Sequence, residues 1–544
     1  MPILSQTLDG TDSSTSPNVA YRQLSSDSQG GPDLRGRASQ LRELEEVPQG
    51  RHLGLFSTIV LFVSRIVGSG IFATSSGIYQ DVGGSPFLFF LAWFLAAALS
   101  FSGLYVYLEL GSLVPRSGGT KVFLEFIYEK PYMLACVVFL IYSIMFGFNM
   151  LNALVFGEYF LHSIGIKADE FHTRLTGLLC VYFAAAIHGI SYSHGVRAQN
   201  IIGALKLLLL LIMVLTGLYL VLMPSSISHI HSNLHWDDFF KTKTPMTSST
   251  FAGAIIKASF SFSGWNSAHT VSNEVKDPIR TFKIAGPVSL IIVTVAYMLT
   301  NLAYIVVIPH DEIVNSGQLI GSLLFEKVFG HKVGKQFLTL SVALCASGNI
   351  FVVLYTISRV SQEVFREGFL PCSNFMASNW PFGAPLPTLV LSCTLTTLVI
   401  LAPKGDLYNY IIALEGYPNQ VFLGLTAFGI FIIRKRSPEL RAPIRASLMG
   451  TVFLLLITLY LTISPFTSSK SPNPKGLENW PSYAVVAILC LGVCVSYWIV
   501  MFRLLPYVFG YRLTSKEVEL SDGLIVKKWV KTYGDIPVDL DFID

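Results

Sequence analysis

The chain has 544 residues, of which 52% are hydrophobic and only 13% are charged, and its formal net charge is +4. A soluble globular protein carries about 25% charged residues, so this composition excludes a soluble domain and indicates no nucleic acid partner. Apolar stretches of roughly 18 residues or more recur along the chain, which is typical of membrane-spanning helices. We therefore predict an all-α polytopic membrane protein in the lipid bilayer.

Residues 1–50 differ from the rest of the chain in composition. They are rich in Ser, Gly, Asp, Gln and Arg, and they contain no lysine. Such a segment buries too little apolar surface to offset the entropy of ordering, so we predict a disordered cytoplasmic tail. It has no apolar region of the signal-peptide kind, and we expect the first span to direct membrane insertion.

Twelve membrane spans follow this tail. Their approximate extents are 53–80, 86–113, 132–161, 174–192, 197–223, 251–275, 284–308, 336–365, 385–402, 408–433, 446–466 and 481–504. We predict a ten-helix transport core over 51–434, spans 11 and 12 within 435–505, and a cytoplasmic C-terminal tail over 506–544. Placing both termini in the cytoplasm puts most of the 38 Lys and Arg residues inside, as the positive-inside rule requires.

Two spans are interrupted by glycine. The first contains "GSG" at 68–70 and the sixth contains "SGW" at 263–265, so the interruptions occupy matching places in two five-span halves. Paired interruptions of this kind predict a 5+5 inverted repeat with a binding site near the bilayer midplane. The alternative is that Gly68 and Gly70 form a small-residue surface against a neighbouring helix.

A broken helix in a membrane presents backbone groups that water cannot satisfy. The N–H groups of Ser69, Gly70 and Ile71, at the start of the second half-helix, suit a carboxylate. Carbonyl groups at the end of the other half suit an ammonium. Together they predict a site for the head group of an amino acid.

Several motifs resemble those of the amino acid/polyamine/organocation transporters, in the same order. They are "GSGIF" in span 1, "SGLYVYLELGSLVPRSGGTKVFLEFIYEKP" at 102–131, "RAQNIIGALK" at 197–206, "FSFSGWNSAHTVSNEVKDPIRTFKIA" at 260–285 and "REGFLP" at 366–371. Within that superfamily, "EVKDPIRTFKIAGP" and "SGLYVYLELG" are most similar to the fungal methionine permeases, relatives of the L-type amino acid transporters. The resemblance implies the inverted-repeat fold and transport of an amino acid.

The resemblance also implies roles for individual residues. The substrate carboxylate would meet Ser69 and Gly70, and the ammonium would meet the carbonyls of Ile66, Phe260 and Ser263. Phe260 would also act as a gate, while Trp265 and Asn266 would border the pocket. The candidate substrate-binding residues are Ile66, Gly68, Ser69, Gly70, Ile71, Phe260, Ser263, Trp265 and Asn266.

Ionisable residues inside spans are functional candidates, because each costs on the order of 2.5–3.5 kcal/mol at a helix centre. Lys206 matches a family lysine and would be either a structural cation bonded to span-1 carbonyls or a titrating group. Arg65 would pair with Glu158 or Glu274, act in the inner gate, or reach cytoplasmic water. Glu415, beside Gly416 and Pro418, is our candidate for a proton-coupling carboxylate.

The expected function is uptake rather than catalysis. Cysteine spacing shows no metal motif, and we predict no metal, no cofactor and no enzyme activity. We predict a plasma-membrane symporter that takes up a neutral L-amino acid, most of all methionine, by alternating access with a proton. The alternatives are an exchanger of large neutral amino acids and a nutrient-sensing transceptor. Ubiquitin-ligase adaptors on the cytoplasmic tails are further expected partners, with acceptors among Lys516, Lys527, Lys528 and Lys531.

Overall fold

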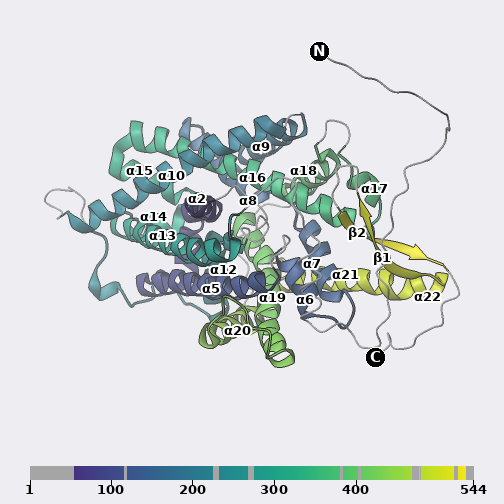
Figure 1. Ribbon diagram of the computed structural model, residues 1–544. Coiled ribbons are helices and arrows are strands. Elements are labelled where there is room, and N and C mark those ends of the chain that lie inside the picture. The colour runs from purple at the N-terminus through teal and green to yellow at the C-terminus, as the bar shows by residue number, and fades with distance from the viewer. Residues whose placement is uncertain are drawn as a thin grey trace, which may run out of the picture.

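The computed structural model describes residues 54–114, 119–190, 192–223, 232–266, 275–379, 384–401, 406–467, 477, 479–519 and 525–533. The predicted N-terminal tail and Glu274 lie outside the described residues. The described chain is mostly helical, with a single pair of strands near its C-terminal end (Figure 1). The predicted all-α class therefore holds for the membrane part of the fold.

The first half of the chain folds into helices that succeed one another with short connections. They are α2 (Leu55–Ile66), α3 (Gly70–Ala73), α4 (Ser75–Asp81), α5 (Pro86–Leu113), α6 (Thr120–Ile127), α7 (Leu134–Met145), α8 (Met150–Ser163), α9 (Glu170–Ile190), α10 (Tyr192–Leu222), the 3-10 turn η1 (Trp236–Asp238) and α12 (Ser248–Ser261).

The second half continues in the same manner and ends in the strands. Its elements are α13 (Pro278–Val307), α14 (His310–Asn315), η3 (Gly317–Leu319), α15 (Ile320–Gly330), the π-helical η4 (His331–Leu338), α16 (Thr339–Arg366), α17 (Ser373–Met376), α18 (Leu386–Ile400), α19 (Leu407–Arg436), α20 (Leu448–Ile463), η5 (Ser464–Phe466), α21 (Tyr483–Ile499), the π-helical η6 (Val500–Leu504), α22 (Leu505–Phe509), β1 (Arg512–Glu519) and β2 (Ile525–Thr532).

Ten helical segments in the described part are long and apolar enough to cross a membrane. The predicted sixth and ninth spans are the two that fall outside this group. They correspond to α12, which has 14 residues, and to α18, which has 15 residues. The chain is thus a multi-pass membrane protein, whereas the count of twelve crossings stays a prediction.

Interruptions of the membrane helices place backbone groups inside the fold. The predicted break in the first span is present, because α2 ends at Ile66 and α3 begins at Gly70. In the sixth span, α12 stops at Ser261, just before the predicted interruption at 263–265, where Gly264 has a φ of +111°. A third interruption was not predicted: residues 146–149 separate α7 from α8.

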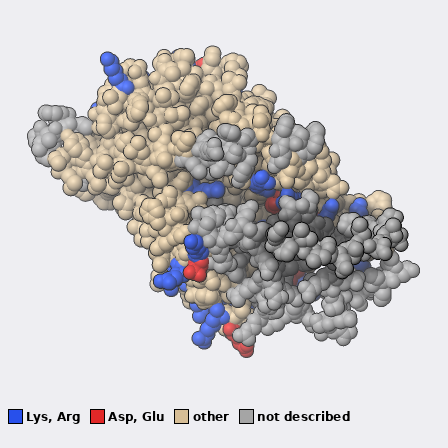
Figure 2. Space-filling model, turned by 45° about the horizontal axis from the view of Figure 1, so that its top comes forward, with Lys and Arg blue, Asp and Glu red and all other residues tan. Residues whose placement is uncertain are grey.

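The surface agrees with a membrane location. Figure 2 shows a broad face of uncharged atoms, and most Lys, Arg, Asp and Glu residues in view gather toward one side of the molecule. Many large apolar side chains point outward from the long helices, among them Phe94, Leu211, Leu456 and Leu489. Lipid chains can cover such side chains at no hydrophobic cost.

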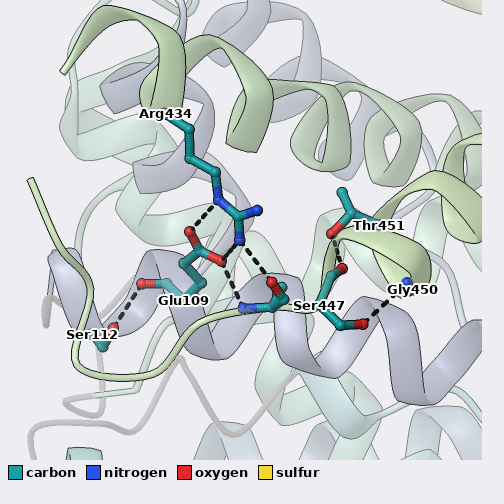
Figure 3. A network of polar contacts seen from close by, with 7 residues as sticks. Glu109, Ser112, Arg434, Ser447, Gly450 and Thr451 are labelled. Atoms are coloured by element: carbon teal, nitrogen blue, oxygen red, sulfur yellow. Dashed lines mark hydrogen bonds and ion pairs between the residues drawn. The ribbon is translucent and has the colours of Figure 1, made fainter. Parts of the chain in front are cut away.

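One buried ion pair ties three segments together (Figure 3). Arg434, at the end of α19, donates to both carboxylate oxygens of Glu109 on α5, at 3.1 and 2.6 Å. The same guanidinium donates to the carbonyl of Ala446, whose N–H donates to Glu109 Oε2 at 2.7 Å. The bidentate geometry of this ion pair fixes the chain just before α20.

The C-terminal segment, predicted as a tail, contains an antiparallel hairpin of β1 and β2. The hairpin lies beside α17 and α21 (Figure 1), and the N–H of Trp529 donates to the carbonyl of Glu367 at 2.7 Å. The Trp529 ring is buried against Tyr132 and Phe502. Aromatic packing and a backbone hydrogen bond therefore attach this part of the predicted tail to the helices.

Candidate functional site

The two predicted breaks meet in the structure. A Cβ atom at Gly70 would lie 2.7 Å from Ser261 Oγ and 2.9 Å from Ser261 Cα, so only glycine allows this approach. Beside it, the Thr74 hydroxyl lies 2.9 Å from Ser261 Oγ and 2.9 Å from the Gly70 carbonyl. A Cβ at Gly264 would lie 2.6 Å from the Arg65 carbonyl. The backbones of the first and sixth spans thus touch on both sides of the breaks.

The start of α3 carries backbone donors that nothing in the described chain accepts. Val67 N–H still bonds to the Val63 carbonyl, but the N–H groups of Ser69, Gly70 and Ile71 make no hydrogen bond to a described residue. All three residues are buried. Unpaired buried N–H groups are costly, so this helix start is suited to an acceptor from outside the chain.

Tyrosine hydroxyls hold the carbonyls around the breaks. Tyr297 on α13 donates between the carbonyls of Ile66 and Ser261, at 3.2 and 3.1 Å. Tyr304, two turns further along α13, donates to the Ile71 carbonyl at 3.3 Å. The Tyr297 and Tyr304 side chains are themselves fully buried. Their hydrogen bonds therefore hold the backbone around the breaks against α13.

Amide side chains approach the first break from the third span. The Ser69 hydroxyl donates to Asn152 Oδ1, the Asn152 amide donates to Asn149 Oδ1, and the Asn149 amide donates to the Ile350 carbonyl, each at 2.9 Å. Asn149 stands in the unpredicted interruption between α7 and α8, and its own N–H donates to Thr396 Oγ1 at 3.0 Å.

A second amide approaches from α16. The Lys206 ammonium donates to Asn349 Oδ1, which turns the Asn349 NH₂ group away from the cation. That nitrogen would lie 3.2 Å from a Cβ at Gly68. Lys206 is buried, and its hydrogen bond thus orients a donor toward the first break.

A buried ion pair joins the two broken spans further along α4. Lys257 Nζ on α12 lies 2.8 Å from Asp81 Oδ2 at the end of α4, with side-chain exposures of 7% and 21%. An opposite charge at this distance offsets much of the cost of burying either group. Lys257 lies within the predicted sixth span, 251–275, and no role was predicted for it.

Known proteins are similar to this chain over most of its length. Residues 53–494 match the family model for amino acid permeases. The chain belongs to the amino acid permease family. The permease is 44% identical over 488 residues to the low-affinity methionine permease of Saccharomyces cerevisiae, covering 89% of each chain. It is 32% identical over 505 residues to the high-affinity methionine permease of the same yeast, covering 91% of this chain and 87% of the relative. Over 453 residues it is 27% identical to the mouse large neutral amino acids transporter small subunit 2, covering 82% and 81%.

Family membership establishes the general function that was predicted from the sequence, the transport of amino acids. The permease is a transport protein rather than an enzyme, and its relatives place it with the methionine permeases, which are related to the L-type transporters. Amino acids are accordingly its substrate class.

The permease's predicted residues in the sixth span lie in different surroundings. Phe260 is half-buried, and its carbonyl accepts the Ser263 N–H at 3.0 Å. Ser263 and Asn266 are exposed. Trp265 is buried against α5, where a Cβ at Gly103 would lie 2.7 Å from its indole ring.

The structure also shows the surroundings of the three ionisable residues that were predicted to have a function. Arg65 donates to Thr356 Oγ1 on α16 at 3.2 Å. Lys206 donates to a side-chain amide on α16, whereas the structural alternative had assigned it to carbonyls of span 1. The Glu415 carboxylate is half-buried and makes no hydrogen bond or ion pair with any residue in the described ranges, and its backbone carbonyl accepts the Tyr142 hydroxyl at 3.0 Å.

Sequence reasoning missed several residues that surround the breaks. Asn149, Asn152, Tyr297 and Asp81 were not among the predicted site residues. Gly147, two residues before Asn149 inside an apolar run, was the available signal for the third interruption. No local pattern distinguishes Tyr297 from other aromatic residues of a membrane helix.

Proposed function

We propose that this permease takes up a neutral amino acid, methionine above all, into the cell across the plasma membrane. Transport would proceed by alternating access with proton symport, and both termini would be cytoplasmic. The chain would cross the membrane twelve times in two five-span halves plus two spans, with α12 and α18 supplying the sixth and ninth crossings. The supporting observation is that the N–H groups of Ser69, Gly70 and Ile71, beside the second broken span, have no hydrogen-bond partner among the described residues. The similarity to two methionine permeases supports methionine as the substrate.

Labelled-methionine uptake in cells that lack their own methionine permeases tests this proposal. We expect accumulation above the external concentration, increased by lowering the external pH and abolished by a protonophore. Competition by a panel of amino acids would define the substrate range. Uptake that requires internal amino acid would identify an exchanger, and binding without accumulation would identify a transceptor. Either result would contradict symport.

Glu415 is the proposed carrier of the coupling proton. The carboxylate is half-buried and unpaired within the described residues, as a group that gains and loses a proton requires. We expect Glu415→Gln to abolish the increase of uptake at acidic pH while exchange of bound methionine continues. Glu439→Gln, which alters an exposed acid between α19 and α20, serves as the control. An unchanged pH profile in Glu415→Gln would remove this residue from the coupling step.

Ubiquitin-ligase adaptors are proposed to recognise the cytoplasmic tails. The expected acceptors, Lys516, Lys527, Lys528 and Lys531, lie on the two strands, where Lys528 donates to Asn374 Oδ1 at 3.2 Å. Replacing all four by Arg should slow substrate-induced internalisation, measured by the surface level of a tagged protein. Lys241→Arg, in the loop before α12, is the control. Wild-type turnover in the fourfold variant would exclude these acceptors.

A further inference from the structure

A short helix outside the long spans, α14, is bound to the part of the chain that follows the first break. It packs against α4. The Ser76 hydroxyl on α4 donates to the Ile313 carbonyl on α14 at 2.6 Å, and the Gln80 amide donates to the Val314 carbonyl at 2.5 Å. Both carbonyls belong to the C-terminal turn of α14, where helix carbonyls have no partner within the helix. Side chains of α4 therefore hold this end of α14.

The other end of α14 contacts α4 through a histidine. His310 Nδ1 lies 3.2 Å from the Tyr79 hydroxyl, and the two rings are T-shaped with centroids 5.5 Å apart. The Tyr79 hydroxyl makes no other hydrogen bond to a described residue, so it directs its proton at a neutral imidazole. A Cβ at Gly84 would lie 3.0 Å from the same nitrogen. The ring therefore occupies the space that this glycine leaves between α4 and α5.

Charged groups from three elements surround this contact. Lys243, in the loop before α12, and Asp311, the next residue of α14, both act electrostatically on His310. Asp238 of η1 acts on the Tyr79 hydroxyl. The backbone of the lysine is held nearby, because its N–H donates to the carbonyl of the glycine that precedes α5 by three residues, at 2.8 Å. A proton on the histidine would thus add a second positive charge beside that lysine.

The contact is sensitive to pH in a defined direction. Burial and the Lys243 charge lower the pKa of His310 from its ordinary value of 6.5, and Asp311 acts in the opposite direction. Glu312, on the same helix, is paired with Lys327 at 3.0 Å. A lowered pKa means that the contact favours the neutral imidazole. The contact is therefore present in full above pH 6.5 and is lost as the pH falls through the lowered value.

We propose that His310 is a proton sensor on the extracellular face, and that its protonation releases α14 from α4 and favours opening of the permease to the outside. Opening on that side requires α4, which follows the first break, to separate from the elements packed over it. This inference rests on the proposed function, because α14 faces the outside only if both termini are cytoplasmic. The step is separate from the coupling proton on Glu415, since it requires neither substrate nor transport.

Labelling of a cysteine under α14 by a membrane-impermeant maleimide, in intact cells, tests this inference. Ile313→Cys places the thiol where the native side chain is 2% exposed. Asn315→Cys, on the exposed side of the same helix, corrects for the effect of pH on thiol reactivity. Labelling of the parent protein, which keeps its seven cysteines, is subtracted. We expect the ratio of the two labelling rates to rise severalfold when the external pH is lowered from about 7.5 to about 5.

Two substitutions of the sensor remove the titrating group. His310→Gln keeps a polar side chain, and His310→Phe keeps a ring against Tyr79, so the second variant preserves the test if the first loosens the contact at every pH. We expect the labelling ratio to be the same at both pH values in each. His235→Gln is the matched control, because it removes an exposed histidine just before η1. It should keep the pH dependence of the parent protein.

The outcomes separate this inference from the proposed function. A labelling ratio that does not change with pH would overturn the sensor while leaving the proposed orientation intact. A pH-dependent ratio that persists in both His310 variants, or that is lost in His235→Gln, would also overturn it. Absence of labelling of Asn315→Cys would place α14 inside the cell and contradict both proposals. If the ratio responds as expected but methionine is not taken up, the proposed function fails and the sensor stands.

Discussion

Gly70→Val should abolish methionine uptake while the protein still inserts into the membrane. The Cβ of any larger residue would lie 2.7 Å from Ser261 Oγ and 2.9 Å from Ser261 Cα. A backbone atom cannot swing aside as a flexible side chain can, so α3 would have to move away from α12. Overpacking costs up to about 3 kcal/mol, which corresponds to a loss of about a hundredfold in a binding equilibrium. Uptake of labelled methionine, normalised to surface protein, measures this loss.

Gly492→Val is the matched control for this substitution. Gly492 lies in α21, and a Cβ there meets nothing within 4 Å, so valine adds bulk without a collision. We expect wild-type uptake from this variant and an intermediate loss from Gly70→Ala. Normal uptake by Gly70→Val would show that the contact between the two broken spans is not needed, and the proposed site would be wrong.

Lys257→Met should cause a large loss of stability. It leaves the Asp81 carboxylate, now 2.8 Å from the lysine and mostly buried, without its counter-charge. Removing one partner of a buried pair costs about 3–5 kcal/mol, and we expect the lower end because Asp81 is 21% exposed. Thermal unfolding of the purified permease in detergent, followed by the loss of monodisperse protein, measures the change.

The double substitution Asp81→Asn with Lys257→Met distinguishes a lost charge partner from lost packing. Because it removes both charges, it should recover most of the stability that Lys257→Met alone loses. The pair would also hold α4 against α12, so we expect uptake to recover with stability. A double variant as unstable as Lys257→Met would contradict the ion-pair explanation. Lys327→Met, at an exposed pair with Glu312, should have little effect, because exposed pairs contribute about 0–1 kcal/mol.

Hydrophobicity and glycine placement were enough to predict the membrane class, most helices and both broken spans. A helix that crosses the lipid bilayer needs a long run of apolar residues, and such runs can be read directly from the sequence. The motif "GSG" predicted the end of α2 because few other residues allow a helix to open there. Family motifs carried the prediction of an amino acid permease, which the comparison over residues 53–494 established.

For α12 and α18, the length of the apolar run in the sequence exceeds the length of the helix in the structure. Residues 251–275 were predicted as one span interrupted at 263–265, and α12, the helix before the interruption, ends at Ser261. The interruption at 146–149 was missed because an apolar run continues through it. Its backbone is satisfied by distant hydroxyls: Ser392 donates to the Gly147 carbonyl at 2.7 Å, and Thr396 accepts the Asn149 N–H.

By itself, then, the sequence determined that this chain spans the membrane, where its first and sixth helices break, and which family it belongs to. Those properties depend on neighbours within a few residues or on motifs read in order. Only the tertiary structure decided the partners of the buried polar groups: Asp81 for Lys257, Asn349 for Lys206, and the amide chain that takes the proton of Ser69. These partners lie 83 to 176 positions away, and a hydrogen bond or ion pair depends on the distance between atoms, which only the packing of the helices establishes.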